Sequence, residues 1–204
     1  IDVINMSVGE PDFMTPDHVK EAGKKAIDDN FSKYSPVPGY PVLREAISKK
    51  LKDENNLDYA ASEIIVGTGG KQGVCNAVLA LVNPGDEVII PAPYWVSYPQ
   101  MVKLAGGVPV IVSAGIEQDF KITAEQLEEA ITPKTKMIIL CSPSNPTGSV
   151  YTAEELEDLS KVVLAHEDVF VLSDEIYEHI NYIGGHCSIA SCSGMKERTI
   201  LCNG

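Results

Sequence analysis

The sequence predicts an α/β fold in which helices cover both faces of a mostly parallel sheet, a three-layer αβα sandwich. From residue 63 onward, apolar runs suited to buried strands alternate with helical segments, as in domains built around a parallel sheet. One of these runs, residues 169–172, is apolar throughout, which indicates a strand buried on both faces. The chain has 204 residues, 44% of them hydrophobic, enough for a sizeable core.

The elements follow in a regular order. A helix begins at Pro16, because proline suits a first helical turn, and a second covers residues 41–54, each with one apolar face. Strands are then expected at residues 64–66, 88–90, 108–112, 137–141, 169–172 and 199–202, and helices between most of them at 72–82, 96–105, 124–131 and 153–165. The last two helices open with capping boxes, Thr123 with Gln126 and Thr152 with Glu155.

Composition argues against several classes of protein. The net charge of −13 would repel nucleic acids and anionic membrane surfaces, so we expect neither as a partner. No run approaches the roughly 18 apolar residues of a membrane span, and residues 1–5 lack the basic start of a signal peptide, which favours the cytoplasm. The five cysteines form no CxxC pair, and their spacing with His179 and His186 matches no zinc pattern, so we expect neither disulfides nor a metal.

Polar and aromatic residues follow the predicted strands at the edge where parallel sheets bind ligands. A glycine-rich stretch, residues 67–71, leads into a helix and can cradle a phosphate with backbone amides. Trp95, Asn145, Asp174 and Tyr177 follow three later strands. Together they would suit a phosphorylated aromatic heterocycle with a basic ring nitrogen and a ring hydroxyl, although Asp174 alone could equally be a solvated loop acid.

Two other phosphate-binding motifs come close to the glycine-rich stretch. A P-loop would need glycine in place of Ile65 and serine or threonine in place of Gln72. The dinucleotide motif G-x-G-x-x-G matches Gly67 and Gly69 but again meets Gln72. A dinucleotide- or nucleotide-binding module that carries out no chemistry therefore stays as the alternative from a different functional class.

Six motifs in order resemble the class I/II pyridoxal-phosphate aminotransferases of fold type I, most of all bacterial aspartate aminotransferases. They lie at residues 9–13, 34–39 with 43–44, 70–72, 93–95, 144–148 and 173–177. The resemblance implies that the cofactor pyridoxal 5'-phosphate is held by Tyr34, Gly70, Lys71, Trp95, Asn145, Asp174 and Tyr177. Asp174 would keep the ring nitrogen protonated so that the ring acts as an electron sink, and Tyr177 would bond the ring hydroxyl.

The resemblance also implies how substrate and subunits meet. Gly9, Trp95 and Asn145 would contact the substrate, and Tyr34 would reach the phosphate of a neighbouring subunit, which implies a homodimer. The implied reaction moves an amino group from aspartate to 2-oxoglutarate, with aromatic or other amino acids as alternative donors. The family also implies a cis bond between Asn145 and Pro146.

The resemblance divides the chain into two parts. Residues 1–40 would contribute to a small domain and the subunit interface, and residues 41–204 would form the large cofactor-binding domain. The Schiff-base lysine of the family and its carboxylate-binding arginines would lie beyond Gly204. We therefore expect this chain to be an incomplete domain, ending on a core strand and inactive by itself.

Overall fold

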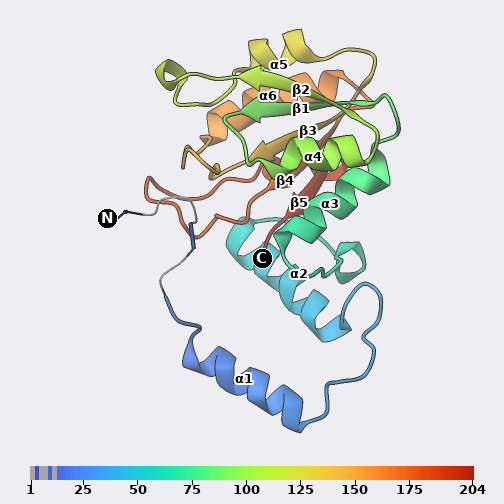
Figure 1. Ribbon diagram of the computed structural model, residues 1–204, viewed down its shortest axis with the longest axis vertical. Helices are drawn as coiled ribbons and strands as arrows, with labels where there is room; N and C mark the ends of the chain where they lie inside the picture. The colour runs from blue at the N-terminus through green and yellow to red at the C-terminus, as the bar shows by residue number, and fades with distance from the viewer. Residues whose placement is uncertain (1–2, 5–8, 11–12) are drawn as a thin grey trace. The chain divides into compact units, whose positions relative to one another are not determined.

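The computed structural model describes residues 3–4, 9–10 and 13–204, and the chain divides into two compact units, residues 1–37 and 38–204 (Figure 1). The first unit contains α1 (Asp17–Asp28), for which Pro16 is the N-cap, and none of its residues is buried. Two residues of the predicted motif at 9–13, Pro11 and Asp12, lie outside the described residues. The assignment of residues 1–40 to a small domain and an interface stays a prediction.

The second unit is built on a five-stranded sheet in which all neighbouring strands are parallel. The strand order is β2-β1-β3-β4-β5. The strands are β1 (Glu87–Ala92), β2 (Val108–Ser113), β3 (Thr135–Cys141), β4 (Phe170–Asp174) and β5 (Thr199–Cys202). The strand order reverses between β1 and β3, and such a switch point is where open α/β sheets bind ligands at their carboxyl edge. The predicted α/β fold is confirmed.

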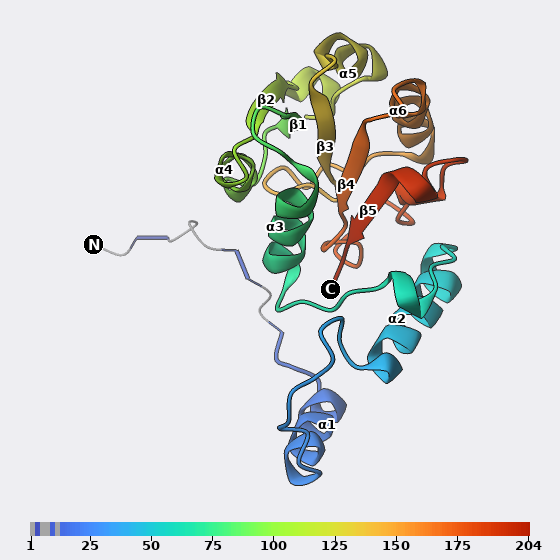
Figure 2. The same cartoon turned by 90° about the vertical axis from the view of Figure 1, so that its right-hand side faces the viewer.

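Helices cover both faces of this sheet (Figure 2). On one face, Val74 and Val78 of α3 (Gly70–Leu81) and Met101 of α4 (Ser97–Leu104) pack on strand residues in one core cluster. On the other, Leu127 of α5 (Ala124–Ala130) and Leu156 of α6 (Ala153–Ala165) belong to a second cluster. The remaining helices are α2 (Pro41–Asn55) and the short 3-10 turns η1 (Ala61–Glu63), η2 (Ile116–Gln118), η3 (Ile189–Ser191) and η4 (Lys196–Arg198).

The predicted strand at residues 64–66 is wrong. This segment follows η1 as irregular extended chain, and Val66 N donates to Pro38 O at 3.1 Å instead of joining the sheet. Ile64 is buried but Ile65 is 78% exposed, so this short apolar run does not lie between two helical layers. The dinucleotide-binding alternative needs a strand before its glycines, and the described chain has none there.

The helix boundaries show which local signals were reliable. Both capping boxes form, with Thr123 accepting from Gln126 N and Thr152 from Glu155 N. α3 begins at Gly70, two residues earlier than predicted, so the glycine-rich stretch supplies its first turn. All five cysteines are free thiols in the described chain. No helix among the described residues has the length and apolar character needed to cross a membrane.

Candidate active site

Asp174 is the last residue of β4 and lies at the centre of the carboxyl edge. Its register partners are Cys141 in β3 and Cys202 in β5, and its residue exposure is only 6%. The hydroxyl of Tyr98 donates to Asp174 Oδ2 at 2.7 Å, and the backbone N–H of Ile176 donates to Oδ1 at 3.3 Å. Asp174 is therefore a buried, oriented carboxylate and not a solvated loop acid.

Burial controls the protonation of this group and its neighbours. It raises the pKa of Asp174 above the ordinary value, although the hydrogen bonds from Tyr98 and Ile176 oppose that shift. Burial, together with the charge of Asp174, also raises the pKa of Cys141 and of Cys202 to about 11, and the pKa of Tyr98 rises for the same reasons. The neighbouring thiols and phenol stay protonated at neutral pH, which leaves Asp174 as the group that can carry charge among them.

Trp95 and Tyr98 connect Asp174 to the glycine-rich stretch. Trp95 is half-buried just before α4, and its ring meets that of Tyr98 edge to face, with centroids 5.4 Å apart. Lys71 Nζ lies 4.9 Å from the centroid of the Trp95 ring. Tyr98 was not among the predicted site residues. The signal that could have identified it was its position in the first turn of α4, three residues after Trp95 at the ligand edge.

The N-terminus of α3 packs against the end of the sheet. Gly69 precedes the helix with φ +82°, a conformation that side chains disfavour. A Cβ on Gly73 would lie 3.1 Å from Cys202 Sγ, and that thiol donates to Gly70 O at 3.4 Å, so the approach is close. The first amides of a helix have no acceptor one turn earlier, so the N–H groups of Gly70 and Lys71 are available to an anion.

The loop after β3 brings Asn145 to Tyr177. Asn145 Nδ2 donates to the Tyr177 hydroxyl at 3.4 Å. Gly148 N donates to Ser144 O at 2.8 Å, which closes the loop on itself. The predicted cis bond between Asn145 and Pro146 is present. The loop therefore presents an amide next to a phenol.

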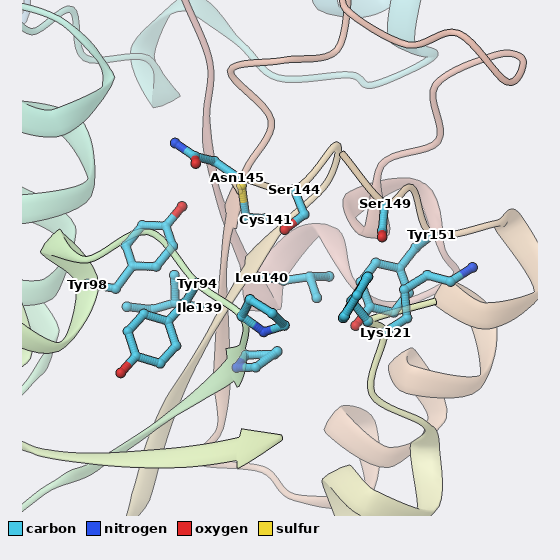
Figure 3. A pocket seen from close by; sticks show the side chains of 13 residues that line it. Tyr94, Tyr98, Lys121, Ile139, Leu140, Cys141, Ser144, Asn145, Ser149 and Tyr151 are labelled. Atoms are coloured by element: carbon cyan, nitrogen blue, oxygen red, sulfur yellow. The ribbon is translucent and has the colours of Figure 1, made fainter. Parts of the chain in front are cut away.

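A small pocket lies behind these groups. It has a volume of about 20 Å³ and is lined by β1, β3, the loops that follow these two strands, Tyr98 of α4, and the segment after β2 at Phe120 and Lys121. Figure 3 shows Tyr94 and Tyr98 at one end of this pocket and Lys121 and Tyr151 at the other. Such a volume admits a water molecule but not a heterocycle. The candidate cofactor site is therefore the surface formed by the strand ends.

Six of the eight predicted site residues are linked by these contacts. Lys71 Nζ lies over the Trp95 ring, and Trp95 contacts Tyr98, whose hydroxyl donates to Asp174. Gly70 O accepts a hydrogen bond from the thiol of Cys202, the β5 register partner of Asp174. Asn145 donates to the Tyr177 hydroxyl. The other two, Gly9 and Tyr34, are exposed residues of the first unit, and their roles stay predictions.

Comparison with known proteins identifies the family. Residues 1–203 match the family model of aminotransferase class I and II. The aspartate/prephenate aminotransferase of Cereibacter sphaeroides is 53% identical over the whole chain, and a probable aspartate/prephenate aminotransferase of Rickettsia bellii is 58% identical. The match covers 51% and 52% of these two relatives, so the chain spans about half their length.

Solved structures agree with this assignment. An aspartate aminotransferase of Thermus thermophilus with maleate has a TM-score of 0.93 and 47% identity, covering 97% of this chain and 51% of that one. An aromatic aminotransferase of Pyrococcus horikoshii has a TM-score of 0.96 and 45% identity, covering 100% of this chain and 54% of that one. The chain belongs to the class I and II aminotransferase family.

Proposed function

We propose that the protein to which this chain belongs is a pyridoxal-phosphate-dependent aminotransferase. The observation that carries the proposal is the buried carboxylate of Asp174 at the carboxyl edge of the sheet, held by the Tyr98 hydroxyl at 2.7 Å. A carboxylate buried without a cation needs a functional reason, because its desolvation is unfavourable. A protonated ring nitrogen would supply the missing positive charge.

The other groups at this edge fit the remaining parts of the cofactor. The open N-terminus of α3 at Gly70 and Lys71 suits a phosphate. The half-buried indole of Trp95 suits a planar ring, and Asn145 with Tyr177 offers an amide and a phenol to a ring hydroxyl. These donors lie on one sheet edge, and each matches a different polar part of pyridoxal phosphate.

Each residue then has a distinct task. Asp174 accepts the hydrogen bond of the ring nitrogen and keeps the proton at that atom. Tyr177 and Asn145 orient the ring through its hydroxyl, while Gly70 and Lys71 anchor the phosphate. The chemistry that the group supplies when bound is withdrawal of electrons from the substrate α-carbon and carriage of the amino group.

The substrates that we propose are aspartate as amino donor and 2-oxoglutarate as acceptor. The names of the Cereibacter sphaeroides and Rickettsia bellii relatives support aspartate and prephenate, whereas the Pyrococcus horikoshii structure supports an aromatic donor as the second candidate. We further propose a cytoplasmic homodimer, in which Tyr34 reaches the cofactor phosphate of the partner and Gly9 lines the substrate site.

The test uses the full-length protein. With pyridoxal phosphate bound, it should transfer amino groups from aspartate to 2-oxoglutarate faster than from phenylalanine or alanine. A full-length protein that binds the cofactor but favours an aromatic donor would overturn the aspartate assignment alone. One that neither binds the cofactor nor transfers an amino group would overturn the proposed function.

A further inference from the structure

The turn that follows β4 is held by two buried glutamates. Residues 174–178 carry Asp174 and Tyr177, and they also carry Glu175 and Glu178, whose side chains are only 1% and 4% exposed. A carboxylate tolerates such burial only when hydrogen bonds or opposite charges compensate for lost water. The hydrogen bonds and ion pairs of these two glutamates therefore hold residues 174–178 in place.

Glu175 ties the turn to the segment before η3. Its Oε1 accepts hydrogen bonds from Ser173 Oγ at 2.8 Å and from Ser188 Oγ at 2.6 Å. Its Oε2 lies 2.6 Å from Nε2 of His186. The backbone N–H of Glu175 also donates to Cys202 O in β5 at 2.8 Å. Both carboxylate oxygens are thus engaged by protein groups.

Glu178 ties the same turn to α2. Lys50 Nζ forms an ion pair with Glu178 Oε1, and Asn55 Nδ2 donates to Oε2 at 2.6 Å. Nε2 of His179 lies 3.2 Å from Oε1. Burial acts to raise the pKa of Glu178, but Lys50 and Asn55 outweigh it and hold that pKa below the ordinary value. The carboxylate is therefore ionised and anchored to a helix more than 100 residues earlier in the chain.

We propose that Glu175 and Glu178 are positioning residues, which hold the side chains of Tyr177 and Asp174 in the orientation that the cofactor needs. This role rests on the proposed function. Tyr177 lies between the two glutamates, and Glu178 N donates to Glu175 O at 3.0 Å within the turn. Because the turn is anchored to two separate parts of the fold, it cannot shift without breaking one anchor. Neither glutamate has to touch cofactor or substrate.

A metal ion is a poorer account of the same cluster. Oxygens of Glu175 and Glu178 and a ring nitrogen of His186 lie within 4.8 Å of one another. However, Oε1 of Glu175 already accepts hydrogen bonds from two hydroxyls and Oε2 lies against His186 Nε2. The ammonium of Lys50 neutralises Glu178 and would repel a cation. The carboxylate oxygens of both glutamates have protein partners without an ion, although the buried Nδ1 atom of His186 has no hydrogen-bond partner among the described residues.

The test follows Tyr177 directly in the full-length protein labelled with 3-fluorotyrosine. The Tyr177 fluorine resonance is identified by its loss in Tyr177→Phe. In Glu178→Gln and Glu175→Gln, we expect this resonance to move while that of Tyr151 stays in place. Asn55→Ala removes the hydrogen bond to Glu178 and the one that Asn55 Oδ1 accepts from Lys50 Nζ, but it keeps the ion pair of Lys50 with Glu178. It should therefore move the resonance less, and it keeps the test open if a glutamate variant fails to fold.

Glu155→Gln is the matched control. Glu155 also pairs with a lysine, Lys121 at 2.8 Å, but it lies on α6 and makes no contact with the turn among the hydrogen bonds and ion pairs described. The Glu155→Gln variant should have a lower unfolding temperature than wild type, with the Tyr177 resonance unmoved. An unmoved Tyr177 resonance in Glu178→Gln, with a lower unfolding temperature, would show a merely structural role and overturn the proposal.

A double-mutant cycle connects position to cofactor binding. The contact that Glu178 would position is one hydrogen bond from Tyr177, so Glu178→Gln should weaken cofactor affinity by roughly three- to tenfold. In the Tyr177→Phe background the same change should have a much smaller effect, because the contact being positioned is already gone. Equal losses in both backgrounds would contradict the proposal. Absence of cofactor binding by the wild type would refute the proposed function, and the fluorine result would still decide whether the glutamates position Tyr177.

Discussion

Helices α3 and α6 cover opposite faces of one sheet and begin in opposite ways. At α6, Thr152 and Glu155 form a capping box in which each side chain accepts a hydrogen bond from the backbone N–H of the other residue. At α3, Gly69 and Gly70 open the helix with no side-chain cap. The start of α6 is capped by side chains of the protein, whereas the start of α3 has no such cap and leaves backbone N–H donors available to a ligand. The comparison separates a helix start that stabilises the fold from one that can bind an anion.

The carboxylates of the two regions, Glu155 and Asp174, also differ in whether protein groups compensate for their burial. Burial acts to raise the pKa of Glu155, but Lys121 and the backbone N–H of Thr152 outweigh it and lower that pKa. Burial dominates at Asp174 and raises its pKa. Glu155 is fully compensated within the protein, while Asp174 still lacks a positive partner among the contacts described. Polar groups left uncompensated therefore mark the functional side of the sheet.

The strongest test of this contrast is Asp174→Asn in the full-length protein. Asparagine cannot hold the ring nitrogen in its protonated form, so we expect amino transfer to fall by about 1000-fold or more. Steady-state rates with aspartate and 2-oxoglutarate measure the effect. Glu155→Gln at the start of α6 should leave the rate within about twofold of wild type. Comparable activity of Asp174→Asn and wild type would remove Asp174 from the catalytic residues.

The second test compares the two helix starts. A Cβ on Gly69 meets no atom within 4 Å, so Gly69→Ala acts through backbone strain at φ +82°, which costs about 1–3 kcal/mol. Relief of that strain should displace the first turn of α3 and weaken cofactor binding about tenfold. Thr152→Ala should cost about 1 kcal/mol of stability through loss of a cap. It should leave cofactor affinity unchanged. An equal loss of affinity in both variants would show that the two helix starts do not differ in anion binding.

The third test uses the pH dependence of stability in the cofactor-free protein. The raised pKa of Asp174 means that its contribution is most favourable at low pH and is lost as pH rises through the folded-state pKa. Asp174→Asn should therefore unfold at a higher temperature than wild type at neutral pH, with the difference shrinking in acid. The pKa of Glu155 is lowered, so its contribution to stability has the opposite pH dependence and is present at neutral pH. Glu155→Gln should therefore be less stable than wild type at neutral pH and approach wild type as pH falls. Thermal scans from acid to neutral pH measure both.

The smallest expected effect concerns Tyr98. Its hydroxyl stabilises the ionised form of Asp174, so Tyr98→Phe should raise the pKa of that carboxyl further. A carbon-13 titration of labelled aspartate, assigned through Asp174→Asn, measures the shift. Tyr151→Phe is the matched control, because it removes a buried hydroxyl that instead accepts from Ile122 N. Identical titration of Asp174 in both variants would show that Tyr98 does not tune it.

Local signals determined much of the fold. The five predicted strands from residue 88 onward form, and α6 has the predicted bounds, because apolar runs and capping boxes depend on nearby residues. The order of strand ends likewise brought Trp95, Asn145 and Asp174 to one edge, since parallel strands place their carboxyl ends together.

Tertiary contacts decided the rest. Residues 64–66 looked like a strand, but Val66 N donates to Pro38 O and the segment pairs with no strand of the sheet. The bond from Tyr98 to Asp174 spans 76 residues, and the ion pair of Lys50 with Glu178 spans 128. The sequence alone could identify the acids at the strand end. Only the fold showed which carboxylate is compensated and which is open to a ligand, because compensation depends on partners that chain folding brings together.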